Sequence, residues 1–124
     1  MKKLSILFFA LVLGLFFFGA DAFANRLILK VPGLGKVEAN PAARQLIFTA
    51  FKPGKVPMEY SIWTPRGSMQ SEAGGWAKPE FRPAVKREKM PHYVPFIITI
   101  SRYEKIGVAI CRENDGRIGC KVIR

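Results

Sequence analysis

The sequence has few of the residues on which catalytic and metal sites depend. Its 124 residues include two cysteines and one histidine, and only 9 acidic residues stand against 20 lysines and arginines. It also has no glycine-rich phosphate loop, no nucleophile elbow and no cluster of metal ligands. We therefore expect no metal and no cofactor, and we favour a protein that is not an enzyme.

A long hydrophobic run occurs only at the start of the chain. Lys2 and Lys3 give residues 1–3 a positive charge, residues 4–18 are mostly apolar, and Ala22 and Ala24 are small residues at the spacing of a cleavage site. This pattern predicts a signal peptide over residues 1–24, cut after Ala24 or, at a second such site, after Ala22. An uncleaved membrane anchor is the alternative, but the run is short for a spanning helix of about 20 residues. We expect a periplasmic or secreted protein with no membrane span after cleavage.

Acidic residues remain scarce beyond the signal peptide. Cleavage removes Lys2, Lys3 and Asp21, so residues 25–124 keep 18 basic and 8 acidic residues and a net charge of +10. These 100 residues suffice for one domain, which at this size is only marginally stable without a covalent link.

The two cysteines are placed to supply such a link. Cys111 and Cys120 flank Asp115-Gly116, a dipeptide typical of the two-residue turn of a β-hairpin. Counting outward from that turn puts the cysteines opposite each other in a non-hydrogen-bonded pair, where side chains approach most closely. An even cysteine count in an exported chain also favours a disulfide over a metal site.

The predicted hairpin has two different faces, because side chains alternate along a strand. One face is expected in the core: Ala109, Cys111, Ile118, Cys120 and Val122. The other is expected in solvent and carries Arg112, Arg117 and Lys121 beside Ile110. The three cations are candidates for an anion-binding stripe, although charge on an edge hairpin more commonly serves to prevent unwanted strand pairing.

Alternation predicts further strands near residues 26–31, 58–63 and 96–101. The side chains expected to face inward are Leu27, Leu29 and Val31; Met58, Tyr60 and Ile62; and Phe96, Ile98 and Ile100. Short strands bounded by turn residues indicate an all-β fold, or a β-rich α+β fold. We expect a small antiparallel β-sandwich or a small barrel, ending in a disulfide-bridged hairpin.

Residues 41–51 fit two interpretations. Asn40-Pro41 could begin a helix, whereas the β-branched and aromatic residues that follow suit a buried strand, which we favour. The spacing of Asn-Pro, Phe, Gly, Tyr and a closing Gly between Asn40 and Gly67 resembles that of many immunoglobulin-like modules. This resemblance implies a sandwich of the immunoglobulin type.

The periodicity stops between residues 65 and 92, which predicts a long loop, with a short helix over residues 83–90 as an alternative. A second set of candidate anion contacts lies within it: Lys86, Arg87 and Lys89. Trp76 is a candidate for stacking on a sugar or a base. The commoner role of such an indole is to fold back over the sheet, because exposed apolar area is unfavourable.

One weak catalytic constellation is present. Glu80, Arg82 and His92 could supply a base, a phosphate clamp and an acid, as in small secreted ribonucleases. Any basic chain of this length contains such a trio by chance.

The charge favours a role in binding. We predict that residues 25–124 form a single basic, β-rich domain that binds an anionic polymer, a lipid head group or an acidic protein without catalysis. Nucleic acid is less favoured, because export separates the protein from most cellular DNA and RNA. One alternative is a protein–protein interaction module, such as an envelope-complex subunit or an inhibitor of a secreted enzyme. The other is a small secreted basic nuclease or toxin.

Overall fold

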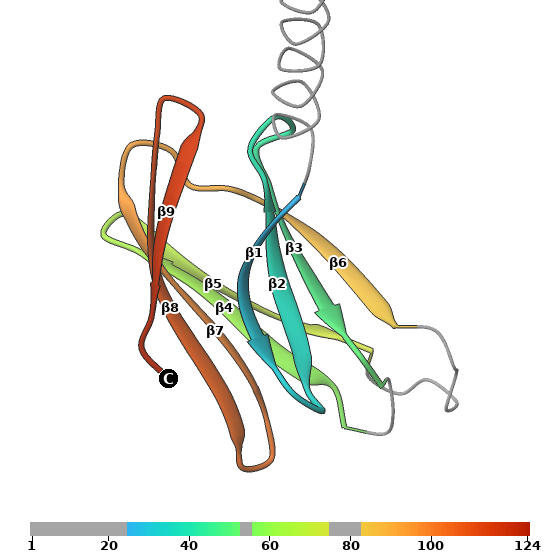
Figure 1. Ribbon diagram of the computed structural model, residues 1–124. Coiled ribbons are helices and arrows are strands. Elements are labelled where there is room, and N and C mark those ends of the chain that lie inside the picture. The colour runs from blue at the N-terminus through green and yellow to red at the C-terminus, as the bar shows by residue number, and fades with distance from the viewer. Residues whose placement is uncertain (1–24, 53–55, 75–82) are drawn as a thin grey trace, which may run out of the picture.

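The computed structural model describes residues 25–52, 56–74 and 83–124 (Figure 1). Over these residues the chain consists of strands and turns, so the fold is all-β. Every pairing of neighbouring strands is antiparallel. The strands are β1 (Arg26–Val31), β2 (Gly35–Asn40), β3 (Gln45–Ala50), β4 (Met58–Thr64), β5 (Gly67–Ala73), β6 (Ala84–Lys89), β7 (Pro95–Arg102), β8 (Lys105–Asn114) and β9 (Arg117–Val122).

The strands form two sheets that pack face to face as a sandwich (Figure 1). The four-stranded sheet has the order β1-β2-β3-β6, and the five-stranded sheet has the order β5-β4-β7-β8-β9. The segments β2-β3-β6 and β5-β4-β7-β8 follow the A-B-E and C′-C-F-G strand orders of immunoglobulin-like sandwiches. Two separate sheets with free edge strands confirm the sandwich and exclude the small barrel.

The core lies between the inner faces of the two sheets. On β4 and β7 every second side chain is fully or almost fully buried, as the alternation predicts: Met58, Tyr60, Ile62, Phe96, Ile98 and Ile100. The ring of Phe48 on β3 stacks on that of Tyr60, with 4.2 Å between the ring centroids. The Tyr60 hydroxyl donates a hydrogen bond of 2.6 Å to Glu88 on β6, so the polar end of this buried ring is satisfied.

The ambiguous stretch at residues 41–51 contains a strand, β3, and the strand interpretation is confirmed. Asn40 uses its side-chain oxygen to accept a hydrogen bond from the Ala43 amide, 3.2 Å away, and Arg44 has a positive φ of 54°. These features close a turn over residues 41–44 and end it before a helix can form.

The prediction of a long loop over residues 65–92 is wrong, because β5 and β6 lie within it. The alternative of a helix over residues 83–90 is also wrong, since this stretch is strand β6. Both strands are at the edges of their sheets and most of their side chains are at least partly exposed, so neither shows the alternation by which β4 and β7 were recognised. The turn between β4 and β5 is closed by Thr64, whose hydroxyl donates to the Gly67 carbonyl over 2.8 Å.

The inward face predicted for β1 is wrong at Leu27. The register between β1 and β2 shifts between Leu27 and Leu29, so Leu27 lies opposite the outward-facing Glu38 and is 59% exposed. Ile28, which strict alternation would turn outward between Leu27 and Leu29, is buried instead. A β-bulge inserts one residue and moves every side chain before it to the other face of the sheet.

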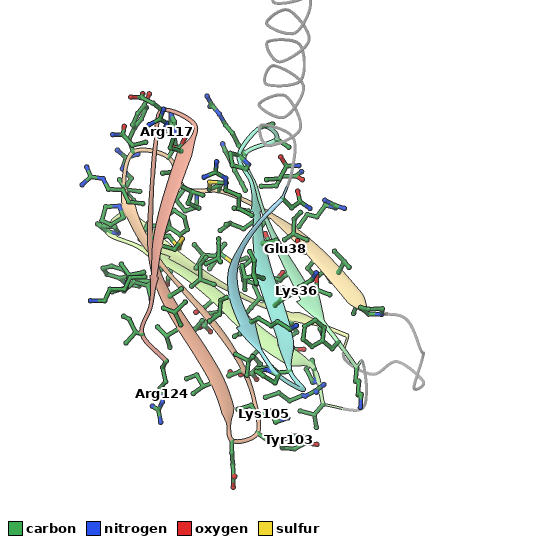
Figure 2. All side chains as sticks on the ribbon, viewed as in Figure 1. Lys36, Glu38, Tyr103, Lys105, Arg117 and Arg124 are labelled. Carbon is green, nitrogen blue, oxygen red and sulfur yellow. A yellow bond between two sulfur atoms is a disulfide. The ribbon has the colours of Figure 1, made fainter. Side chains whose placement is uncertain are left out.

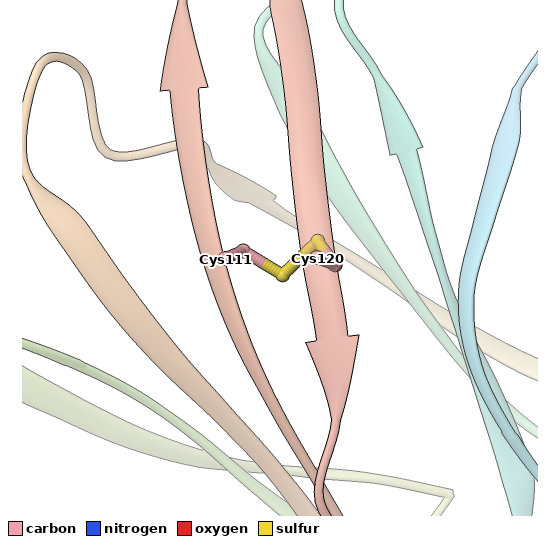
Figure 3. The surroundings of a disulfide bond; sticks show 2 residues. All are labelled: Cys111 and Cys120. Atoms are coloured by element: carbon pink, nitrogen blue, oxygen red, sulfur yellow. A yellow bond between two sulfur atoms is a disulfide. The ribbon is translucent and has the colours of Figure 1, made fainter.

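The C-terminal hairpin has the predicted register. Asn114 pairs with Arg117 across the turn, and Cys111 pairs with Cys120 and forms the predicted disulfide, with 4.1 Å between the two Cα atoms (Figure 3). The inner face is buried at Cys111 but exposed at Cys120 and at Val122. The predicted burial of these last two is wrong, because β9 is the edge strand of its sheet and has little of the other sheet above it.

The predicted signal peptide, residues 1–24, lies outside the described residues. Within the described part of the chain, no helix has the length and apolar character needed to cross a membrane.

Candidate functional site

Three large apolar side chains lie in a row on the outer face of the five-stranded sheet, the face turned away from the core. The strand registers place Trp63 on β4 opposite Ile97 on β7, and Ile97 opposite Ile110 on β8. Trp63 is 48% exposed and Ile110 is 41% exposed, while Ile97 between them is half-buried. We call Trp63, Ile97 and Ile110 the apolar row. Exposed apolar area on one face is typical of a surface that a partner covers.

Basic side chains gather next to the apolar row, at the end of the sheet where the β4–β5 and β8–β9 turns lie. Lys121 on β9 lies opposite Ile110 and extends the row, and Arg112 lies two residues beyond Ile110 on the same face. Arg117 follows the β8–β9 turn, and Arg66 lies in the β4–β5 turn at the same end of the sheet. All four cations are exposed. We call Arg66, Arg112, Arg117 and Lys121 the basic end.

The charge of the basic end is not neutralised by ion pairs within the described residues. Among these residues Lys36 and Glu38 form an ion pair, 3.1 Å apart on the four-stranded sheet, and the Glu113 carboxylate is hydrogen-bonded to His92. Figure 2 shows Arg117 at the tip of the β8–β9 hairpin, well apart from Lys36 and Glu38. The basic end can therefore attract an anion from solution.

The disulfide supports the basic end. Cys111 directly precedes Arg112 on β8, and Cys120 directly precedes Lys121 on β9. The covalent link between the two strands fixes the spacing of these cations before any ligand arrives, which lowers the entropy that binding must overcome.

The opposite end of the same face is acidic. Glu59 on β4 lies opposite Glu72 on β5, and both line a hollow of about 380 Å³ together with serine and threonine side chains of β4, β5 and β7. The hydroxyls of Ser61 and Thr99 are hydrogen-bonded to each other in this hollow. Glu59 is four residues from Trp63, which is about 13 Å along an extended strand. The outer face is thus polarised along the direction of its strands.

The six cations predicted as anion contacts do not form one site. Three are in the basic end, on the solvent face of the hairpin as predicted: Arg112, Arg117 and Lys121. The other three lie on β6: Lys86, Arg87 and Lys89. β6 and β9 are the edge strands on opposite sides of the sandwich (Figure 1). Side chains alternate along β6, so Lys86 also faces the opposite way from its two neighbours in this group.

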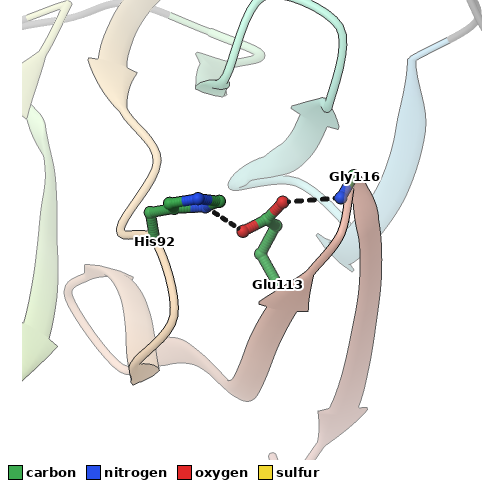
Figure 4. A network of polar contacts seen from close by, with 3 residues as sticks. All are labelled: His92, Glu113 and Gly116. Atoms are coloured by element: carbon green, nitrogen blue, oxygen red, sulfur yellow. Dashed lines mark hydrogen bonds and ion pairs between the residues drawn. The ribbon is translucent and has the colours of Figure 1, made fainter.

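Only part of the predicted catalytic trio can be located. Glu80 and Arg82 lie outside the described residues, as does Trp76, the predicted stacking group. His92 precedes β7, and its Nδ1 is hydrogen-bonded to the carboxylate of Glu113 on β8 (Figure 4).

Glu113 connects His92 to the turn of the hairpin. Its Oε1 accepts a hydrogen bond of 2.9 Å from the Gly116 amide, while its Oε2 is hydrogen-bonded to Nδ1 of His92. Burial raises the pKa of Glu113, but the Gly116 amide, His92 and the charge of Arg44 outweigh burial and hold the pKa below its ordinary value. Glu113 is thus ionised at neutral pH with both carboxylate oxygens engaged, which is an arrangement that holds the turn in place.

The apolar row was not predicted from the sequence. Trp63, Ile97 and Ile110 each occupy an outward position of a recognised strand, where a single apolar residue is ordinary. Only the pairing of β4, β7 and β8 brings them together. The available signal was the recurrence of a large apolar residue at outward positions of three strands.

Comparison with protein-family models, with curated proteins and with solved structures found no match for this chain.

Proposed function

We propose that this protein is exported and is a non-catalytic binding module for an anionic ligand or surface in the cell envelope, with the basic end as its contact. The observation that carries the proposal is the gathering of four exposed cations at one end of one sheet face. Arginine presents a planar fork of donors that matches phosphate and carboxylate oxygens, and three of the four cations are arginines.

The charge of the whole domain supports the same proposal. Residues 25–124 carry a net charge of +10, which attracts anionic surfaces over distances longer than a contact. The attraction between exposed charges is screened by salt, with a Debye length of about 8 Å at physiological ionic strength. Binding through the basic end should therefore weaken as salt is added.

A second candidate function is a protein–protein interaction module. It is favoured by the apolar row, because exposed tryptophan is common at the centre of protein interfaces. A complex formed mainly through apolar contact would persist at high salt, which distinguishes it from anion binding.

The test uses residues 25–124, which contain the nine strands found in the described residues. We expect this protein to bind anionic vesicles, lipopolysaccharide or polyphosphate at low salt, and to bind the same probe at least about tenfold more weakly at high salt. Replacing two cations of the basic end, Arg117→Glu with Lys121→Glu, should abolish most of this binding.

The matched control is Arg87→Glu with Lys30→Glu, which changes the net charge equally but lies on β6 and β1 of the other sheet. Binding should be largely retained in this control. An equal loss of binding in the two double variants would show that net charge acts without a specific site. If the protein binds none of the anionic probes at low salt, the proposed function itself is contradicted.

A further inference from the structure

We infer that the outer face of the five-stranded sheet docks on the surface of an anionic phospholipid bilayer, with the apolar row among the head groups and the basic end on the lipid phosphates. The inference rests on the proposed function and specifies the ligand. The proposed function leaves the apolar row unexplained, because a water-soluble anion would bind the cations without contacting these apolar side chains.

The apolar row indicates a ligand that is apolar as well as charged. Phosphate or carboxylate groups in solution need only cations, and they would leave Trp63 and Ile110 in water. Ile123 adds to the apolar area: it is 56% exposed, and its amide donates a hydrogen bond of 2.9 Å to the carbonyl of Val108, the residue that lies on the outer face two positions before Ile110. Tryptophan is enriched at the boundary between lipid and water, because its ring is apolar and its N–H is a hydrogen-bond donor.

The positions of the cations suit the charged layer of a bilayer. Lys121 lies opposite Ile110 in the same cross-strand row, and Arg112 lies two residues after Ile110 on the same face of β8. Long basic side chains can lay their apolar stems on the lipid while their charges reach the phosphates. Each cation near an anionic bilayer contributes to binding, and the contribution falls within a Debye length of the surface.

The acidic end sets the orientation of docking. Glu59 and Glu72 lie at the far end of the face, with Glu59 about 13 Å along β4 from Trp63. Phosphate groups repel these carboxylates and attract the basic end. The sheet should therefore meet the bilayer with the β4–β5 and β8–β9 turns first and keep its acidic end in water.

The experiment measures the fluorescence of Trp63. The chain has two tryptophans, so the protein used is residues 25–124 with Trp76→Phe, in which Trp63 is the one tryptophan left. The probes are vesicles of phosphatidylglycerol with phosphatidylcholine, vesicles of phosphatidylcholine alone, and soluble polyphosphate. We expect binding to the anionic vesicles with a blue shift of the Trp63 emission and quenching by lipids brominated on their acyl chains. Polyphosphate should bind without a blue shift.

The variant that isolates the apolar row is Trp63→Ser with Ile110→Ser, whose binding is followed by vesicle sedimentation. It should bind anionic vesicles about tenfold more weakly or worse, a factor expected from losing part of the buried apolar area. The control is Leu27→Ser with Val85→Ser, which removes two exposed apolar residues of the other sheet and should leave vesicle binding unchanged. Thermal unfolding confirms that each variant is folded.

The outcomes separate this inference from the proposed function. Salt-sensitive binding to vesicles and polyphosphate alike, with no blue shift and no effect of the Trp63 variant, would overturn the inference and leave the proposed function intact. Binding to none of the anionic probes would overturn both. If the protein forms a dimer that is lost in the Trp63 variant, the inference would also be overturned. In an antiparallel dimer the acidic end of each copy would face the basic end of the other, and the two apolar rows would cover each other.

Discussion

Glu113 is the side chain on which the geometry of the β8–β9 turn depends. It is 4% exposed, yet it is charged, and its partners come from two parts of the chain: the Gly116 amide within the turn and His92 before β7. A buried carboxylate is tolerated only when its oxygens are satisfied, so this residue stabilises the fold through its hydrogen bonds.

We expect Glu113→Gln to lower the free energy of unfolding by about 1 to 3 kcal/mol. The substitution replaces the charged carboxylate whose oxygens are hydrogen-bonded to His92 and to the Gly116 amide. The exposed Glu104, in the β7–β8 turn, provides the control: Glu104→Gln should change stability by less than about 0.5 kcal/mol. Urea unfolding measures both. A Glu113→Gln protein as stable as the wild type would show that the carboxylate contributes nothing.

The same residue should make stability depend on pH. The pKa of Glu113 is lower in the folded state than in the unfolded chain, so its contribution is present above the unfolded value of about 4.3 and is lost as pH falls through the folded value. Below pH 5 the unfolding free energy of the wild type should fall more steeply than that of Glu113→Gln. Parallel curves would contradict this assignment.

At the scale of strands, β1 of one sheet packs closely against β8 of the other. Gly107 on β8 has no side chain, and a Cβ built there would lie 2.6 Å from Cγ2 of Val31 and 2.9 Å from Cδ2 of Leu29. β1 can lie over β8 only because this position is glycine. Gly119 on β9 differs, since a Cβ there would meet open space and its φ is not positive.

These two glycines make a matched pair of substitutions. Gly107→Ala should lower the free energy of unfolding by about 1 to 3 kcal/mol, because the added methyl group forces β1 away from β8. Gly119→Ala should be within about 0.5 kcal/mol of the wild type. Chemical denaturation of both proteins tests the difference, and equal stabilities would show that β1 is not held by this close approach.

At the scale of the whole molecule, the predicted signal peptide and the disulfide point to the same kind of compartment. A disulfide such as Cys111–Cys120 persists in an oxidising environment, and export through the predicted signal peptide would deliver the chain to one. Three cations of the basic end, Arg112, Arg117 and Lys121, stand on the hairpin that this disulfide links, so an oxidising compartment would also preserve this part of the proposed binding surface.

We expect the full chain, produced in a bacterium with an intact export pathway, to be recovered without its first residues. N-terminal sequencing should give Asn25 or Phe23 as the first residue, and thiol titration should find no free cysteine. Recovery of an intact N-terminus in the membrane fraction would instead support the uncleaved anchor.

The features that the sequence determined by itself are those in which neighbours along the chain set the geometry. The Asp115-Gly116 turn fixes the pairing of the strands beside it, and that pairing brings Cys111 opposite Cys120. Alternation on β4 and β7 was equally readable, because both strands are central in their sheet and bury one full face.

The tertiary structure alone decided the rest, because it depends on contacts between distant segments. The edge strands β5 and β6 have little periodicity and exist through pairing with β4 and β3. The bulge at Leu27 is visible only against β2. The apolar row and the basic end are products of strand register. A shift of β7 by one residue would turn Ile97 into the core and interrupt the apolar row on the outer face.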